Sequence, residues 1–540
     1  MTLINLAETT WKKIIAGIAL AASAFLLFWN LGHYSLWADE SLTALSAKAV
    51  LATGDTSAWV GNDNLVAYAN GVELNNMHIR SMPPVPAYMT AASFALFGVN
   101  TWAARFPFAL AGLLAVLLML WWARGASLQY FAILAMGIAG NVSLFLYLRN
   151  CRYYAPTVLF SALTVYCYFT WRGGKGRLIM MALASLLLLA TQYMAFLAVY
   201  VCIALDYLFW RRKEARLALA DWLALLLPQA VLGGIIAWIW NPLRVGYGGR
   251  MSSNSLWDRL VIFYWNLRDA NAVEFFVLPL ILAGFVVALR AKLDIAKPLR
   301  ASVAMLVAMF IIVFFTLQSR AATSVADVRY IVFLIPLGIA LGAWAVCAIL
   351  PNRMALSLLL AAVAFFSNIL NGGMYFTWSG GARSTTYSYV RELLYPTNTD
   401  PCKETARWMK ENIAPGKTVL VESMINDLYP LMFHAPHVIY AWQFNDRSNP
   451  QFASLPAIHF KGEVMPDYLI GFGPQVGQLR NDLNRYSQKG TEYRMATKLD
   501  VFWKDLYRPE LFWRTFTPIT NYNKDVDVVF IFQKVGAPAK

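Results

Sequence analysis

Long apolar runs separated by short polar stretches dominate roughly the first two thirds of the chain. Three of the clearest are Ile14 to Asn30, Phe108 to Trp122 and Ser302 to Leu317, each suited to a helix that crosses a lipid bilayer. Lys12 and Lys13 precede the first run, as they would in a signal peptide, but no small-residue cleavage site follows it. The pattern predicts an α-helical polytopic membrane protein whose first span is retained.

The basic residues between the apolar runs predict the topology, because Lys and Arg collect on the cytoplasmic side. With the N-terminus inside, the basic clusters alternate correctly with about eleven spans or more. These clusters are Arg124, Arg172/Lys175/Arg177, Arg211/Arg212/Lys213/Arg216, Arg290/Lys292/Lys297/Arg300 and Arg353. Residues 178–210 are nearly all apolar yet carry basic clusters at both ends, which favours a hairpin of two short helices turning near Thr191-Gln192.

The same reasoning assigns the outer side of the membrane. It receives residues 31–101, 149–153, 241–272 and 318–329, and everything after about residue 371. We expect juxtamembrane helices in the first of these loops. The loop from Arg244 to Ala272 contains Gly246, Gly248 and Gly249, and is either a mobile lid or a plain connector.

Beyond Pro401 the pattern changes to short alternating helices and strands, which predicts a small extracytoplasmic α/β domain. The expected helices are Lys403 to Ile413 and Pro474 to Gln488, and the expected strands are Thr418 to Glu422, His437 to Trp442 and Val526 to Phe532. We therefore divide the chain into a transmembrane part, residues 1–379, and an outer domain, residues 380–540. No glycine-rich phosphate loop precedes a helix in the outer domain, so no nucleotide is expected there.

The formal charge of +15 would suit a nucleic-acid-binding protein, but its distribution argues against that class. Residues 1–379 contain 26 Lys and Arg against 14 Asp and Glu, whereas the remaining 161 residues contain 19 against 16. Most of the excess therefore lies between the apolar runs, where positive residues orient spans. The five cysteines show neither metal-ligand spacing nor a disulfide framework.

Two carboxylates follow the first span directly, in the stretch Leu36-Trp37-Ala38-Asp39-Glu40-Ser41. A carboxylate at the outer face can act as general base on an acceptor hydroxyl. N-capping of a helix that starts at Ser41 is the alternative explanation, since Asp is a common N-cap. A second polar stretch contains His78, Arg80 and the pair Pro83-Pro84, which fixes a turn and starts a helix.

Arginines also collect in the predicted outer loops, against the usual inside bias: Arg80, Arg149, Arg152, Arg244, Arg250, Arg320 and Arg329. Pairing with nearby acids or lipid headgroups could account for any one of them. For the group, a site that handles anionic phosphate is the better explanation.

Taken in order, these motifs resemble the glycosyltransferase C superfamily, in particular the branch with lipid A aminoarabinose transferases and protein O-mannosyltransferases. The shared landmarks are Asp39-Glu40, His78 with Arg80 before Pro83-Pro84, Phe97-Gly98 followed by Ala104, Arg105 and Pro107, Leu148 to Ala155, Thr191-Gln192-Tyr193, and Arg329-Tyr330 with Pro336. The resemblance covers roughly residues 10 to 370. No single motif is specific, but the order of the motifs and their common side of the membrane together support the resemblance.

The resemblance implies an inverting transferase that moves a sugar from a polyprenyl-phosphate donor to a lipid, glycan or protein acceptor on the outer side. It implies Asp39 as catalytic base with Glu40 beside it, and Arg80 near the donor phosphate. Arg149, Arg152 and Arg329 are further phosphate candidates. The expected substrate groove is formed by His78, Tyr153, Tyr154, Gln192 and Tyr330. The enzyme would be a multi-pass protein of the cell inner (plasma) membrane, with membrane lipid as a further partner.

Two departures from the family pattern bear on metal binding and on the groove. The aminoarabinose branch has Glu before its basic residue, whereas Ile79 precedes Arg80 here, and the spacing from His to Pro is one residue longer. Gln192 stands where the family often has His. We therefore predict no cofactor and no obligatory metal, although a divalent ion is open. A transporter of lipid-linked sugars and a structural scaffold are the alternative functions.

Overall fold

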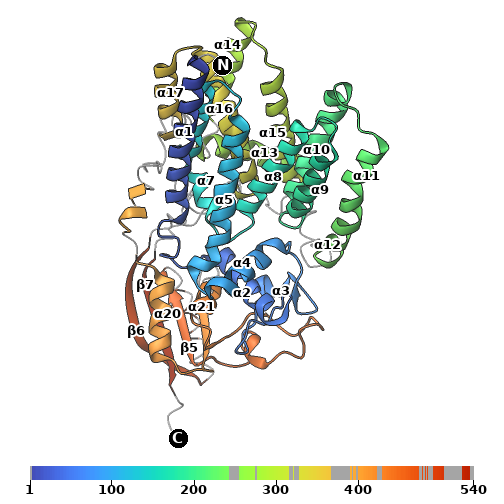
Figure 1. The fold of residues 1–540 in the computed structure, drawn as a ribbon. Coiled ribbons are helices and arrows are strands. Elements are labelled where there is room, and N and C mark those ends of the chain that lie inside the picture. Colours follow the sequence, from blue (N-terminus) through green and yellow to red (C-terminus); the bar gives the residue numbers. More distant parts are fainter. Residues whose placement is uncertain are drawn as a thin grey trace.

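The computed structural model describes residues 3–241, 254–273, 277–315, 320, 328–366, 390–391, 393–396, 399–422, 428–473, 490–503 and 526–535, together with 477, 479, 481, 483 and 484. Within these ranges the chain forms a helical bundle that is joined at one end to a mixed layer of helices and strands (Figure 1). Both the bundle and the mixed layer contribute residues to the site described below.

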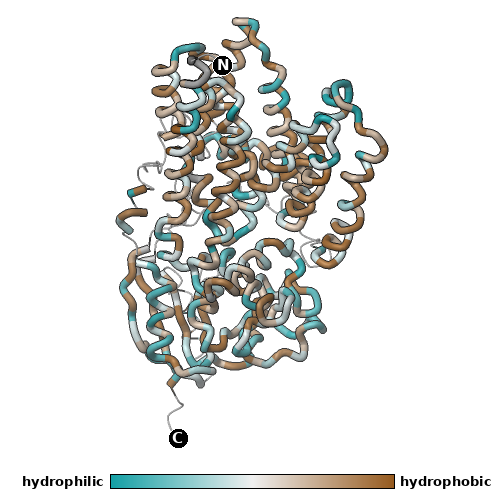
Figure 2. The backbone as a smooth tube through the Cα atoms, in the orientation of Figure 1, coloured by the Kyte–Doolittle hydropathy of each residue, from teal (hydrophilic) through white to brown (hydrophobic). Residues whose placement is uncertain are grey.

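The bundle contains most of the apolar helices of the described chain, together with one more polar helix (Figure 2). They are α1 (Leu3–Phe28), α5 (Thr101–Ala123), α6 (Leu128–Gly140), α7 (Val142–Leu148), α8 (Tyr154–Thr170), α9 (Lys175–Leu189), α10 (Tyr193–Phe209), α11 (Leu219–Pro228), α12 (Gly234–Ile239), α13 (Leu256–Val273), α14 (Leu278–Arg290), α15 (Ala296–Phe314), α16 (Ile335–Ile349) and α17 (Met354–Phe366). A 3₁₀ segment, η5 (Val328–Leu334), leads into α16.

Five segments of the described chain are helical, long and apolar enough to cross a membrane: Ala7–Phe28, Thr101–Ala123, Leu219–Ile239, Ala296–Phe314 and Val328–Ile349. Further apolar helices are shorter than a full span, for example α6 and α10. The membrane character of the chain is therefore supported by several helices, and the number of about eleven spans stays a prediction.

Local sequence signals explain several helix boundaries. The Asn100 side chain accepts a hydrogen bond from the Ala103 N–H at 2.8 Å and begins α5, and Ser127 caps α6 in the same way. The predicted hairpin over residues 178–210 is confirmed, since α9 ends at Leu189 and α10 begins at Tyr193. The pair Pro83-Pro84 leads directly into α4 (Val85–Phe97), also as expected.

The stretch from Arg244 to Ala272 was expected to be a lid or a connector, and its second half is helical instead, because α13 occupies Leu256–Val273. Its sequence is too polar to read as a span, and the Arg259 side chain reaches the Val313 carbonyl at the end of α15. The glycines of the expected lid, and Arg244 and Arg250, lie outside the described residues.

The predicted first outer loop lies at one end of the bundle, beside the C-terminal strands (Figure 1). It contains α2 (Ala38–Thr53), a single helical turn α3 (Tyr68–Gly71), a short hairpin of β1 (Leu74–Asn75) and β2 (His78–Ile79), and α4. Helix α2 packs on α4 on one side and on α21 (Leu428–His434) on the other. Helices are thus present in this region as expected, and α2 carries Asp39 in its first turn.

The C-terminal region, residues 399–535, contains a five-stranded sheet with order β4-β3-β5-β7-β6. Its elements are α20 (Pro401–Asn412), β3 (Thr418–Glu422), α21, β4 (Ile439–Tyr440), β5 (Tyr468–Phe472), β6 (Glu492–Trp503) and β7 (Val526–Val535). Strand β3 pairs in parallel with β4 and β5, whereas β7 pairs antiparallel with β5 and β6.

The expected helix at Lys403 and the strands at Thr418, His437 and Val526 are confirmed in position, and β5 and β6 were missed. Most of the expected helix from Pro474 to Gln488 lies outside the described residues. The division of the chain at residue 380 stays a prediction.

Candidate active site at the start of helix α2

The Glu40 carboxylate is the centre of a buried polar network that joins three segments of the chain. Its oxygens accept hydrogen bonds from Arg105 Nε at 2.8 Å and Arg105 Nη2 at 2.6 Å. They also accept from the Cys151 N–H at 2.7 Å and the Trp37 N–H at 3.3 Å. Glu40 is 0% exposed, so all of its hydrogen-bonding capacity is directed to the protein. Helix α2, helix α5 and the loop before α8 are thereby fixed relative to one another.

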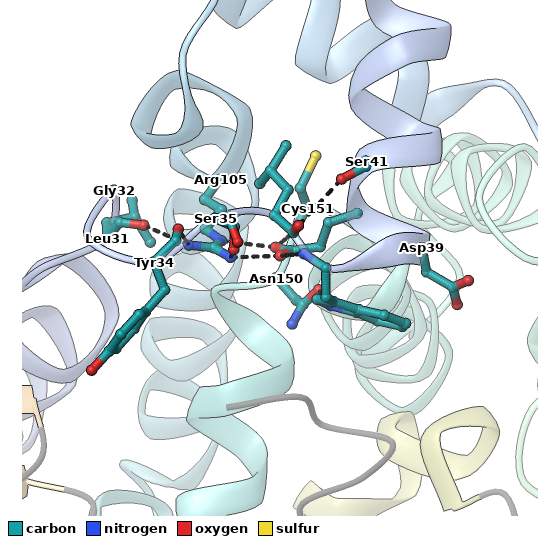
Figure 3. A network of polar contacts seen from close by, with 12 residues as sticks. Leu31, Gly32, Tyr34, Ser35, Asp39, Ser41, Arg105, Asn150 and Cys151 are labelled. Atoms are coloured by element: carbon teal, nitrogen blue, oxygen red, sulfur yellow. Dashed lines mark hydrogen bonds and ion pairs between the residues drawn. The ribbon is translucent and has the colours of Figure 1, made fainter. Parts of the chain in front are cut away.

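Arg105 extends this network to the loop that precedes α2 (Figure 3). Its guanidinium also donates to three backbone carbonyls, those of Leu31, Tyr34 and Ser35. The Trp37 indole N–H donates to the Asn150 side chain at 2.7 Å. The chain entering α2 is therefore held on both sides, which fixes the direction of the residue next to Glu40.

That neighbour is Asp39, and Figure 3 shows it pointing away from the Glu40 network. Asp39 Oδ2 lies 3.0 Å from Arg329 Nη1 and 3.3 Å from Arg152 Nη2. Its side chain is 23% exposed, in contrast to Glu40. Helix α2 begins at Ala38 with Trp37 as N-cap, so Asp39 lies in the first turn and does not cap a helix starting at Ser41. The N-cap alternative is thereby wrong.

Arg152 and Arg329 come from distant parts of the chain, the loop before α8 and the segment η5. Arg152 Nη1 also lies 3.2 Å from Thr43 Oγ1 on α2 and 3.3 Å from Met82 Sδ. Two guanidinium groups thus meet one carboxylate, which leaves one net positive charge among the three side chains. This arrangement is suited to an additional anion.

Two tyrosines predicted for the substrate groove flank these arginines. Arg152 stacks over the Tyr153 ring at 5.4 Å, and Arg329 stacks over the Tyr330 ring at 5.3 Å. Tyr153 and Tyr330 are partly exposed, whereas Tyr154 is buried and packs edge-on against Tyr147 at 5.0 Å. Tyr153 and Tyr330 are therefore next to the Asp39 site, and Tyr154 belongs to the core behind it.

His78 and Arg80 form a second cluster around Asp55, at the end of α2. Arg80 pairs with the Asp55 carboxylate through Nη1 at 2.8 Å and Nη2 at 2.6 Å, and His78 Nδ1 lies 3.4 Å from Oδ2. The hydrogen bonds from Arg80 lower the pKa of Asp55 to about 2. Arg80 also lies over the Trp240 ring at 5.4 Å. The charge of Arg80 is thus matched locally.

The remaining two predicted residues have structural contacts. Arg149 donates to the carbonyls of Leu26 at 3.2 Å and Trp29 at 2.9 Å, and so satisfies the C-terminal end of α1. Gln192 is buried in the turn between α9 and α10. The Val85 N–H at the start of α4 donates to the Ala190 carbonyl in that turn at 3.0 Å. The turn between α9 and α10 therefore contacts the start of α4.

Sequence reasoning gave no role to Arg105, Asp55 or Glu73, three ionisable residues of this region. Arg105 stood inside a quoted motif, and its position before Pro107 was the available signal. Nothing in the local sequence around Asp55 or Glu73 indicated their surroundings. No group of three or more His, Cys, Asp and Glu side chains that could hold a metal occurs among the described residues.

Comparison with known proteins bears on the fold and the family. A family model described as dolichyl-phosphate-mannose-protein mannosyltransferase matches residues 81–240. The fold is similar to that of ArnT from Cupriavidus metallidurans in the apo state, with a TM-score of 0.55 and 13% identity over 88% of this chain and 95% of that chain. The chain resembles the membrane glycosyltransferases of the glycosyltransferase C superfamily.

A second ArnT structure, bound to undecaprenyl phosphate, gives a TM-score of 0.52 with 14% identity and covers 97% of this chain and 98% of that chain. At such identities the likeness is one of fold. An uncharacterized protein of Aquifex aeolicus (strain VF5) is 28% identical over 167 residues, which cover 30% of this chain and 29% of that relative. The aligned part therefore spans less than a third of the length of that relative.

Proposed function

We propose that this protein is an inverting glycosyltransferase that moves a sugar from a polyprenyl-phosphate-linked donor to an acceptor hydroxyl on the extracytoplasmic side of the cell inner membrane. The single observation that carries the proposal is the Asp39 carboxylate, partly exposed and held by the guanidinium groups of Arg152 and Arg329. The glycosyltransferase C fold and the mannosyltransferase family model support a lipid-linked sugar as donor.

Asp39 is the proposed general base. It would take the proton of the acceptor hydroxyl as the acceptor oxygen attacks the anomeric carbon of the donor sugar. The bond between that carbon and the phosphate oxygen breaks, and the polyprenyl phosphate leaves with the bonding electron pair. A single displacement of this kind inverts the anomeric configuration.

The two arginines serve the leaving group. Arg152 and Arg329 supply fixed positive charge where the phosphate develops negative charge, and fixed charge in a site with little water is an effective stabiliser of a transition state. An arriving phosphate also competes with Asp39 for these guanidinium groups. Their movement toward the phosphate would release the carboxylate to accept a proton only when the donor is bound.

The other predicted residues receive narrower proposals. Glu40 would act by holding α2 and Arg105 in place, because its oxygens are already engaged. Tyr153 and Tyr330 would line the donor groove next to the arginines. Arg80 and His78 would border it from the loop between α1 and α5, and Gln192 from the turn between α9 and α10. Arg149 would support α1. The C-terminal region would face the acceptor, whether lipid, glycan or protein.

The test uses the purified full-length protein, a panel of polyprenyl-phosphate sugars and a membrane glycolipid extract as acceptor. Release of free polyprenyl phosphate is measured for the wild type, for Asp39→Asn and for Glu463→Gln. We expect Asp39→Asn to reduce release by about 10²- to 10⁴-fold, the usual contribution of a positioned base. Glu463 pairs with Arg447 on the surface of the C-terminal region, so Glu463→Gln should match the wild type.

Each failure has its own meaning. Full activity of Asp39→Asn would remove Asp39 from the mechanism and leave the transferase class standing. Donor binding without release from any donor, together with movement of donor between leaflets in vesicles, would overturn the transferase and favour transport of lipid-linked sugar. Retention of anomeric configuration in the product would refute the single displacement.

A further inference from the structure

The loop before α2 turns back on itself where it passes Arg105 (Figure 3). Arg105 Nη1 donates to the carbonyls of Leu31 and Tyr34, both at 3.0 Å. Because one nitrogen bonds both carbonyls, the chain turns between them, at Gly32 and His33. The carbonyls of these two residues also need hydrogen-bond donors wherever the protein shields them from water.

The donor to both carbonyls is a lysine of the C-terminal region. Lys403 Nζ donates to the Gly32 carbonyl at 3.2 Å and also to the His33 carbonyl. Lys403 lies in the first turn of α20, and its side chain is partly buried. Asp400, the N-cap of the same helix, accepts a hydrogen bond from the Ser35 N–H. The start of α20 therefore holds the loop both at its turn and at its end.

The loop lies between packed parts of the molecule. An added Cβ at Gly32 would lie 3.0 Å from Trp102 Cβ, so the loop is directly against the start of α5. Helix α20 packs on β6, β7 and α21, and α21 packs in turn on α2. Lys403 thus ties the loop to a helix that is itself fixed in the C-terminal region.

We propose that Lys403 is a positioning residue for Asp39 and acts through the loop before α2. Its two hydrogen bonds hold the turn in the shape that lets Arg105 bond the carbonyls on either side. Arg105 also donates to the Glu40 carboxylate at 2.6 and 2.8 Å, and Glu40 is the neighbour of Asp39 in the first turn of α2. Each step from Lys403 to Asp39 is therefore a hydrogen bond or a stretch of connected backbone. The inference rests on the proposed function, because Asp39 is the proposed base.

The expected result separates turnover from donor affinity, because Arg152 and Arg329 come from other segments, the loop before α8 and η5. Lys403→Met removes the ammonium group and keeps a long side chain. The turnover number at saturating acceptor should fall by roughly 10- to 100-fold, since a shift of about 1 Å in a catalytic group has effects of this size. The Michaelis constant for donor should stay within about twofold of the wild type, as for an interaction that matters only in the transition state.

Release of free polyprenyl phosphate by the purified full-length protein gives both constants, with a polyprenyl-phosphate sugar as the varied donor and a membrane glycolipid extract as acceptor. Lys403→Arg keeps a positive group that can donate to two carbonyls, so it should restore most of the turnover. Lys410→Met is the matched control, because Lys410 is exposed on the same helix, and it should match the wild type. If Lys403→Met does not fold, Ser35→Ala removes the hydroxyl that donates to Asp400 at 3.0 Å. It should lower the turnover number less strongly, again without a change in donor affinity.

The possible failures are distinguishable. An unchanged turnover number in Lys403→Met, or a loss that Lys403→Arg does not restore, would overturn the role of Lys403 alone. Wild-type turnover in Ser35→Ala, where it replaces Lys403→Met, would do the same. A rise in the Michaelis constant for donor as large as the fall in turnover would also overturn it, since the whole site would then be distorted. Absence of polyprenyl phosphate release by the wild type with every donor would instead overturn the proposed function, and this inference with it.

Discussion

Replacing Glu40 by Gln removes one negative charge from the centre of the network that positions α2. The guanidinium of Arg105 would keep its three carbonyl acceptors but lose the only carboxylate that it contacts among the described residues. Gln also presents an NH₂ group in place of one carboxylate oxygen, and therefore toward either the Cys151 N–H or the Trp37 N–H, each of which donates to a different oxygen of Glu40. The variant therefore leaves a buried charge unpaired and turns two acceptor positions into a mixed donor and acceptor.

The expected cost is large for a single substitution. Breaking a buried ion pair by removing one partner destabilises a protein by about 3–5 kcal/mol. Removing both charges, in Glu40→Gln with Arg105→Met, should cost less than the two single changes together, because no charge then remains buried. We expect a coupling free energy of about 1–3 kcal/mol between the two positions.

Unfolding by denaturant in lipid-containing micelles, followed by tryptophan fluorescence, measures these free energies. The chain contains 20 tryptophans, and Trp37 belongs to the network itself, so the signal reports the relevant region. Glu463→Gln is the matched control, since an exposed ion pair contributes about 0–1 kcal/mol. Costs for Glu40→Gln as small as those of this control, or single costs that add within about 0.5 kcal/mol, would refute the network as the scaffold of the site.

Three further predictions concern other parts of the molecule. Arg329→Gln should raise the Michaelis constant for donor by roughly 10- to 100-fold, because a charge-assisted hydrogen bond contributes about 1.5–3 kcal/mol. Arg80 lowers the pKa of Asp55 to about 2. Because this pKa is lower in the folded than in the unfolded protein, the pair stabilises the fold above about pH 4, and the stabilisation is lost as the pH falls toward 2. In Asp55→Asn the thermal unfolding midpoint should therefore fall less steeply with decreasing pH than in the wild type. Gly71→Ala should loosen the C-terminal region, because Gly71 has φ +72° and an added Cβ would lie 2.8 Å from the Phe444 ring.

Each of these has a direct check. Steady-state donor titration tests Arg329→Gln, and an unchanged Michaelis constant would remove Arg329 from the donor site. Thermal unfolding between pH 5 and 2.5, a range chosen to bracket the loss of stabilisation, tests Asp55→Asn, and a variant curve parallel to the wild type would contradict the assignment. Limited proteolysis tests Gly71→Ala, and Gly61→Ala, at a glycine with positive φ but open space around it, is the control.

The helical membrane architecture could be predicted from the sequence because its signals are local. Apolar runs, basic clusters and a proline pair determine helices and their boundaries within short segments of chain. The hairpin at Thr191-Gln192 is an example, since only the basic residues at its two ends distinguish two short helices from one long one. Helix α13 was missed for the same reason, because its polar sequence lacks the signal of a span.

The candidate site could be predicted only in part. Asp39, Arg152 and Arg329 were singled out, and the structure brings all three together. The assignment of Arg80 to the donor phosphate came from the family resemblance, and the structure pairs its guanidinium with Asp55. Partners of this kind are determined by how the loop folds back on itself. The contacts from Lys403 to the loop before α2 join segments some 370 positions apart, which no local pattern encodes.

The C-terminal region has a more direct connection to the site than its position in the sequence suggests. Asp400 is the N-cap of α20, accepting from the Cys402 and Lys403 N–H groups, and it also accepts from the Ser35 hydroxyl at 3.0 Å. The carbonyl of Ser35 is one of those held by Arg105, at 2.9 Å. The loop before α2 is thus fixed from the bundle by Arg105 and from the C-terminal region by Asp400. Only Leu36 and Trp37 separate Ser35 from the start of α2, so the direction of Asp39 depends on both contacts. The C-terminal region therefore helps to position the site, whichever acceptor it faces.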